Sequence, residues 1–273
     1  MRVQGNLQKM KTTLASPVVY QLPVGDELVT LNDAIGSSIR LRFIKQINCI
    51  HCGRKTNKSF SQGYCYPCFK SLAQCDMCIV KPETCHLHEG TCREPDWAEQ
   101  HCLQDHFVYL ANSSGIKVGI TRGSQIPTRW IDQGASSAIP VFKTRDRLTS
   151  GKLEVILKQH VADKTDWRKM LKGEPDVVDL GQRRDELLGV SQSELKALEK
   201  DLGSDAFSLL RSEAEVNIEF PVQQYPAKIK AHNFDKTEEV SGVLQGIKGQ
   251  YLMLDSGVLN IRKFGGYLVE LEI

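Results

Sequence analysis

The chain has 273 residues, of which 41% are hydrophobic and 25% are charged, and its formal net charge is +2. This length suffices for a sizeable core and for two or three domains, and the apolar and charged fractions are ordinary for a soluble protein. No segment approaches the ~18 consecutive apolar residues of a membrane span, and the N-terminus lacks the apolar region of a signal peptide. We therefore expect no membrane association and a cytoplasmic location.

Residues 1–48 are predicted to form a β-rich N-terminal segment. In SIRLRFIKQI (38–47), Ile39, Leu41 and Phe43 alternate with Arg40 and Arg42, which is the period of two of a half-buried strand. VVYQLPV (18–24) is a second candidate strand. We find no catalytic or metal-binding pattern in this segment.

Residues 49–105 are predicted to be a zinc-binding cysteine module. It begins with two C-x-x-C pairs, Cys49/Cys52 and Cys65/Cys68, with twelve residues between the pairs. This spacing is typical of a zinc ribbon, in which four thiolates close a tetrahedral site and leave no position for water. The predicted zinc is therefore structural, although an iron–sulfur cluster uses the same ligands.

A second set of potential ligands follows within the same module. Cys75-x-x-Cys78 supplies two predicted ligands, and Cys85 with Cys92 would complete a four-thiolate site. The alternatives are a set that uses His88 with Cys92, and a Cys102-x-x-x-His106 pair. In a reducing compartment, cysteines in such numbers favour metal over disulfides, so we expect one or two zinc ions per chain.

Residues 106–172 are predicted to form a small α/β unit with the order strand, turn, strand, helix, strand, helix. The first two strands are FVYLA (107–111) and IKVGIT (116–121), joined by Asn-Ser-Ser-Gly, which is typical of a hairpin turn. A short helix follows Pro127 and ends at Gly134. The last helix shows a helical spacing of apolar residues, namely Leu148, Leu153, Ile156 and Leu157.

These elements carry a resemblance to the GIY-YIG nuclease superfamily. Tyr109 lies where its first motif ends, Val118-Gly119 where its second motif ends, Arg129 at its helical Arg and Glu154 at its metal-binding Glu. Lys117 occupies the Tyr position of the second motif, as in branches that read "KIG". The similarity covers about a quarter of the chain. With its cysteines, the whole chain resembles an uncharacterised bacterial family of unknown function.

The resemblance implies a metal-dependent cleavage of nucleic-acid phosphodiesters. Glu154 would bind magnesium or manganese, which need few carboxylates and keep their waters. Arg129 would bind the phosphate through its planar donor fork. Tyr109 would either orient the attacking water or act as the general base, with a pKa lowered by neighbouring cations. Lys117 would supply part of that positive field or contact the phosphate directly.

The charge distribution favours a nucleic-acid partner for this unit. Residues 106–172 contain twelve Lys and Arg against five Asp and Glu, whereas residues 173–215 contain five against eleven. A basic segment attracts phosphates, but two oppositely charged segments can also attract each other. Both interpretations stay open at this point.

The remaining chain is predicted to be an acidic helical connector (173–213) and a β-rich C-terminal domain (214–273). Ser191-x-x-Glu194 is a capping-box pattern that would begin a helix, and Gly203 would end it. The predicted strands are VNIEFPV (216–222), AKIKAH (227–232), SGVLQGI (241–247), a hairpin over 249–264 that turns at Asp-Ser-Gly, and GYLVELEI (266–273). Their spacing favours a small barrel or sandwich, to which the N-terminal strands could contribute.

The predicted fold class is thus α+β, with a GIY-YIG-like unit preceded by a zinc ribbon and flanked by β-rich segments. We carry two functions forward: a metal-dependent endonuclease, and a non-catalytic zinc-containing nucleic-acid-binding or adaptor protein on a degenerate nuclease fold. A protein–protein scaffold is a third alternative.

Overall fold

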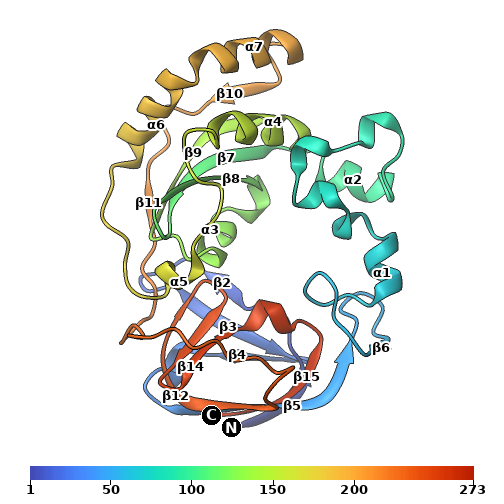
Figure 1. The fold of residues 1–273 in the computed structure, drawn as a ribbon, viewed down its shortest axis with the longest axis vertical. Coiled ribbons are helices and arrows are strands. Elements are labelled where there is room, and N and C mark those ends of the chain that lie inside the picture. The colour runs from blue at the N-terminus through green and yellow to red at the C-terminus, as the bar shows by residue number, and fades with distance from the viewer.

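The computed structural model describes residues 1–273 and shows a mixed helix-and-sheet protein, in agreement with the predicted α+β class. Figure 1 shows three parts arranged as a ring: a β-rich part that contains both chain ends, a second sheet covered by helices, and a cysteine-bearing segment that joins the two on the other side. No helix has the length and apolar character needed to cross a bilayer.

The two ends of the chain build one seven-stranded sheet together. Its order is β1-β15-β5-β12-β13-β14, with β6 paired to β5. The strands are β1 (Arg2–Asn6), β5 (Ser38–Asn48), β6 (Lys55–Thr56), β12 (Glu239–Lys248), β13 (Tyr251–Leu254), β14 (Gly257–Asn260) and β15 (Tyr267–Glu272). A separate three-stranded sheet contains β2 (Lys11–Thr13), β3 (Val19–Val24) and β4 (Glu27–Thr30). The short helices of this part are η1 (Asn32–Ala34) and η7 (Ile261–Phe264).

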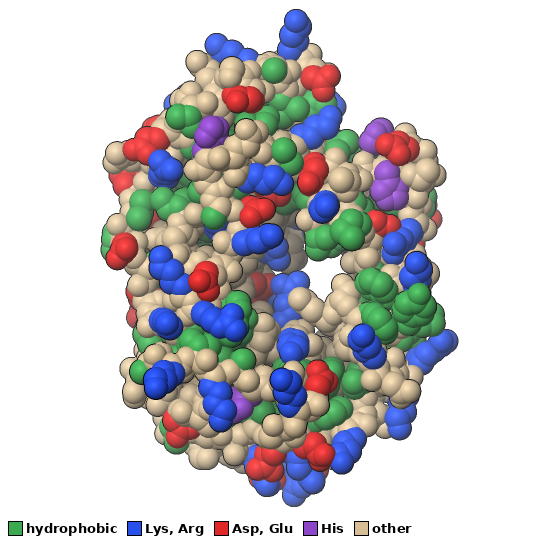
Figure 2. Space-filling model, viewed as in Figure 1, with side chains coloured by type: hydrophobic (Ala, Val, Ile, Leu, Met, Phe, Trp, Pro, Cys, Tyr) green, Lys and Arg blue, Asp and Glu red, His purple; other side chains and the backbone are tan.

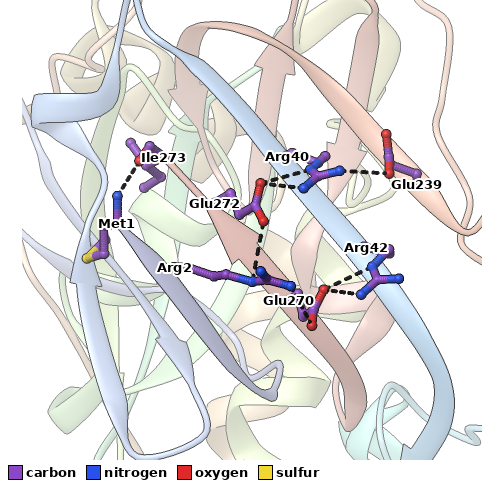
Figure 3. Close-up of polar contacts among 8 residues, drawn as sticks. All are labelled: Met1, Arg2, Arg40, Arg42, Glu239, Glu270, Glu272 and Ile273. Carbon is purple, nitrogen blue, oxygen red and sulfur yellow. Dashed lines mark hydrogen bonds and ion pairs between the residues drawn. The ribbon is translucent and has the colours of Figure 1, made fainter.

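Cross-strand charge pairs follow the register of the larger sheet (Figure 3). Arg40 faces Glu272 and Arg42 faces Glu270 between β5 and β15, and each pair is in hydrogen-bonding contact. Arg2 on β1 reaches Glu270 from the other side at 3.1 Å. Such exposed pairs contribute little individually, about 0–1 kcal/mol, but opposite charges placed face to face help to select this register.

The predicted barrel is wrong, because the seven-stranded sheet stays open, with β1 and β14 at opposite edges. The smaller sheet covers it instead: Leu22 and Val24 of β3 belong to the same buried cluster as Leu41 and Leu271. β1 passes so close to the β3–β4 turn that a Cβ at Gly5 would lie 2.3 Å from the Gly25 nitrogen. This packing, rather than a closing strand pair, covers the apolar face.

The central part has a five-stranded sheet in the order β10-β9-β7-β8, with β11 paired to β9. Its strands are β7 (His106–Asn112), β8 (Ile116–Arg122), β9 (Ser137–Thr144), β10 (Phe207–Leu209) and β11 (Val216–Asn217). Its helices are η6 (Gly123–Gln125), α3 (Thr128–Asp132), α4 (Arg147–Leu157), α5 (Trp167–Met170), α6 (Leu180–Val190) and α7 (Gln192–Leu202). A second core of ten buried residues joins the sheet to α4 and α6. The predicted order of elements over 106–157 is observed.

The cysteine-bearing segment consists of short helices. They are α1 (Tyr66–Ser71), η2 (Ala73–Cys75), η3 (Met77–Ile79), η4 (Pro82–Thr84), η5 (Leu87–Glu89) and α2 (Pro95–His101). The helix predicted between Ser191 and Gly203 is observed as α7, although the Ser191 side chain makes no capping bond. The strand predicted over 227–232 is wrong, because these residues form only one bridge, from Ala231 to Val258.

Candidate metal centre and basic cleft

The first four cysteines form a cluster that can hold a metal ion such as zinc. The Sγ atoms of Cys49, Cys52, Cys65 and Cys68 all lie within 4.8 Å of one another. Those of Cys52 and Cys65 are 3.8 Å apart, as expected for two sulfurs that each lie ~2.3 Å from one zinc in a tetrahedron. The predicted ligand set is therefore brought together.

Local backbone geometry builds this cluster. Cys49 directly follows β5, and the Gly53 nitrogen donates to the Cys49 carbonyl at 2.9 Å with Gly53 in the left-handed region (φ +70°). Cys65 precedes α1, and Cys68 lies within that helix. Glycine tolerates a positive φ at no steric cost, which explains its place directly after the first pair.

The second group of cysteines is only partly brought together. Cys78, Cys85 and Cys92 line one small cavity, but Cys75 does not. Donor atoms of Asp76, Cys78 and His86 lie within 4.8 Å of one another. The alternatives with histidine are not assembled: His88 is exposed and faces Glu89, and the buried His106 bonds through Nδ1 to the Gln104 carbonyl.

A large cleft of about 690 Å³ lies where the three parts of the ring meet. Its lining contains nine cationic and four acidic side chains. The cations are Lys9, Lys81, Lys117, Arg122, Arg129, Arg147, Lys158, Lys164 and Arg262, and the acids are Glu83, Asp132, Glu154 and Asp163. Figure 2 shows an opening through the molecule with Lys and Arg side chains around it. An excess of positive charge in a cleft concentrates anions there.

Lys117 of β8 is one of the most buried cations of the cleft, with 5% of its surface exposed. Burial lowers the pKa of its ammonium to about 8, and the nearby Arg129 guanidinium lowers it further. The Glu154 and Asp163 carboxylates oppose this shift because they raise the pKa. A substantial fraction of this amine is therefore neutral near pH 8, so Lys117 can accept a proton.

Arg129 and Glu154 line the same cleft from two helices, α3 and α4. Burial raises the pKa of the Glu154 carboxyl, and the Asp163 and Glu83 carboxylates raise it further. The Lys158 ammonium lowers this pKa and so opposes the shift. A metal cation near Glu154 would offset this crowding of negative charge. Three of the four predicted catalytic residues, Lys117, Arg129 and Glu154, thus share one cleft.

Tyr109 lies behind the wall of the cleft and does not line it. Its side chain is fully buried, and its hydroxyl donates to Oε1 of Gln133 at 3.0 Å. Burial raises the pKa of Tyr109 despite the opposing Arg129 charge. Gly119 is required opposite this ring, because a Cβ there would lie 2.7 Å from the hydroxyl oxygen. The expected lowering of the Tyr109 pKa is therefore not found.

Residues 36–269 match the family described as "Protein of unknown function (DUF2797)". The chain belongs to this family. No curated protein and no solved structure matches it.

The DUF2797 match contains all nine cysteines and every cleft-lining residue except Lys9. Lys9 and Arg262 were not predicted as site residues, and they also line a second groove of about 550 Å³ that reaches Cys49. Lys9 forms an ion pair with Asp132, which also accepts from Gln250 Nε2 at 2.9 Å. No local sequence signal marks Lys9 or Arg262, because only the tertiary fold brings the chain ends to the central part.

Proposed function

We propose that this protein is a metal-dependent endonuclease that cleaves nucleic-acid phosphodiesters in the basic cleft. The observation that carries the proposal is the cleft itself, in which nine cationic side chains surround a partly buried carboxylate, Glu154. The resemblance to GIY-YIG nucleases supports it, because the Arg and the Glu that correspond to that superfamily's pattern both line this cleft.

Each residue has a distinct role in the proposed reaction. Arg129 binds the scissile phosphate with two parallel donors and stabilises the charge that grows on its oxygens. Glu154 would hold magnesium or manganese, and a metal there would supply a Lewis acid for the leaving oxygen. Glu83 and Asp163 stand near Glu154 and raise the negative potential that attracts a divalent cation.

Lys117, rather than Tyr109, is the proposed proton acceptor for the attacking water. A general base works best with a pKa near the working pH, and the pKa of Lys117 is lowered to about 8 whereas that of the buried Tyr109 is raised. Tyr109 is then a positioning residue: its hydroxyl donates to Gln133, which lines the cleft together with Arg129.

The pH dependence of cleavage tests this assignment. Below pH 8 the neutral fraction of Lys117 rises about tenfold per pH unit, so the wild-type rate should rise with that slope and level off above pH 8. Lys117→Met removes the amine but keeps an unbranched apolar stem, and should lower the rate and flatten the profile. The measurement is nicking of a panel of DNA and RNA substrates with magnesium or manganese between pH 6 and 9.5.

Lys152→Met, which changes a lysine of α4 that does not line the cleft, is the matched control and should keep the wild-type profile. A rising profile that persists in Lys117→Met would assign the base to another group.

A second candidate function is nucleic-acid binding without cleavage. The replacement of the second motif's Tyr by Lys117 and the burial of Tyr109 favour it. Absence of nicking on every substrate of the panel, with binding intact, would select this alternative.

Both functions predict binding that weakens steeply with salt. A protein that contacts six to ten phosphates loses about 10³–10⁵ in affinity between 50 and 200 mM salt, because counterions are released. Arg262→Gln should lower the salt slope by about 1, while Arg183→Gln on the exposed side of α6 should leave it unchanged. Affinity measured by fluorescence anisotropy over a salt series is the test, and binding that does not vary with salt would rule out both functions.

A further inference from the structure

The small cavity in the cysteine-bearing segment is lined by thiols, although their Sγ atoms are not as closely gathered as those of the first cluster. Its volume is about 10 Å³, roughly the space that one water molecule needs. Four cysteines line it: Cys78, Cys85, Cys92 and Cys102. Cys85 and Cys102 lie near each other, although they are far apart within this segment of the sequence.

We propose that Cys78, Cys85, Cys92 and Cys102 bind a second zinc ion in a closed four-thiolate site. This proposal goes beyond the nuclease activity and does not depend on it. It also accounts for eight of the nine cysteines of the chain: four form the first cluster, four line the cavity, and Cys75 alone belongs to neither.

The neighbouring Asp76 is less suited as a ligand, because both of its carboxylate oxygens already have partners. Asp76 accepts an ion pair from Arg93 Nε at 2.6 Å, and its other oxygen accepts from the Cys78 nitrogen at 3.4 Å. Nδ1 of His86 bonds to Thr91 Oγ1 at 2.8 Å. This contact leaves Nε2 of His86 available for a metal, so the argument against His86 is the softer character of the thiols of the cavity, which zinc prefers in structural sites.

Arg147 supports a strongly negative group at this position. Four thiolates around one zinc carry a net charge of −2, and a cation nearby offsets it. The guanidinium of the half-buried Arg147 lies near Cys78, Cys85 and Cys102. Its Nη2 donates to the Ile79 carbonyl at 2.7 Å, but its Nε is buried without a hydrogen-bond partner. A thiolate sulfur of the metal site would be an acceptor for that group.

The site would join the cysteine-bearing segment to α4, the helix that carries Glu154. The Arg147 nitrogen at the start of α4 donates to the Cys102 carbonyl at 2.9 Å. Further along α4, Gly151 packs so closely that a Cβ would lie 2.4 Å from the Glu83 nitrogen. The second zinc would therefore hold one side of the cleft in place.

Zinc content of the purified full-length protein and thiol labelling test the proposal. Wild type should contain two zinc ions per chain, and iodoacetamide should label Cys75 alone until the metal is removed by a chelator in denaturant. Cys102→Ser should lower the content to one, whereas the matched variant Cys75→Ser should keep two. His86→Ala should also keep two.

The proposal fails if wild type contains one zinc, if Cys102 is labelled in the metal-loaded protein, or if Cys75→Ser loses zinc. Loss of one zinc in His86→Ala would also overturn it, and would assign the site to the group Asp76, Cys78 and His86. The labelling of wild type decides the matter if Cys102→Ser does not fold. X-ray absorption of wild type should show four sulfur ligands per zinc at ~2.3 Å, and nitrogen or oxygen ligands would contradict it.

Discussion

Glu154→Gln should abolish cleavage and leave nucleic-acid binding intact or slightly stronger. The amide keeps the shape of the carboxylate but loses the negative charge that attracts a divalent cation in the cleft. Removal of one preorganised charge-stabilising group typically lowers the rate about 10²–10³-fold. The loss in rate should be at least as large here. Binding should not weaken, because one of the four acidic side chains in a cleft with nine cations is neutralised. Nicking rates and binding isotherms, both in magnesium or manganese, measure the two effects separately.

The same substitution at Glu199, an exposed residue of α7, is the matched control and should change neither rate nor affinity. If wild type and Glu154→Gln nick the substrate panel equally, with the zinc content of both intact, the proposed nuclease function fails and the binding function replaces it.

Cys49→Ser should unfold the segment 49–68 and release one zinc ion. Structural zinc binds zinc-finger peptides with about 10–16 kcal/mol of apparent free energy, and this segment has almost no core of its own: only Cys49, Gly63 and Cys65 are buried. Without the metal, few apolar contacts would hold its loops against the cost of ordering them. Limited proteolysis should then cut within 49–68, and zinc analysis should show one ion fewer than in wild type.

Cys75→Ser is a suitable control for this experiment too, because Cys75 follows the segment but lies outside the first cluster. It should resist the protease as wild type does. A Cys49→Ser protein that stays resistant and keeps its full zinc content would show that the first four cysteines do not bind the metal.

Local patterns predicted much of this fold. The period of two in residues 38–47 corresponds to β5, and the turn at 112–115 joins β7 and β8 in an antiparallel pair. The first cysteine cluster follows from its spacing, because two C-x-x-C pairs need only their own turns to converge. In each case the determining contacts lie within a short stretch of chain.

The features that failed depend on contacts that no local pattern encodes. Cys75 and Cys78 have the spacing of a metal-binding pair, but they lie in separate short helices divided by Asp76, which caps the second one. Tyr109 was expected to have a lowered pKa, but it packs against Trp130 within the large core, where burial raises that pKa. Lys9 and Arg262 reach the cleft only because the terminal strands pair with each other.

That pairing determines the order in which the protein can fold during synthesis. β1 pairs only with β15 and therefore has no strand partner until residue 272 has been translated, and β5 has only the two-residue β6 until β12 at 239–248 exists. Pairing over such sequence distances is slow and leaves strand edges exposed meanwhile. The first cysteine cluster, in contrast, closes within residues 49–68. A nascent chain can therefore load its first metal long before the surrounding sheet exists, and we expect metal supply to act early in biogenesis.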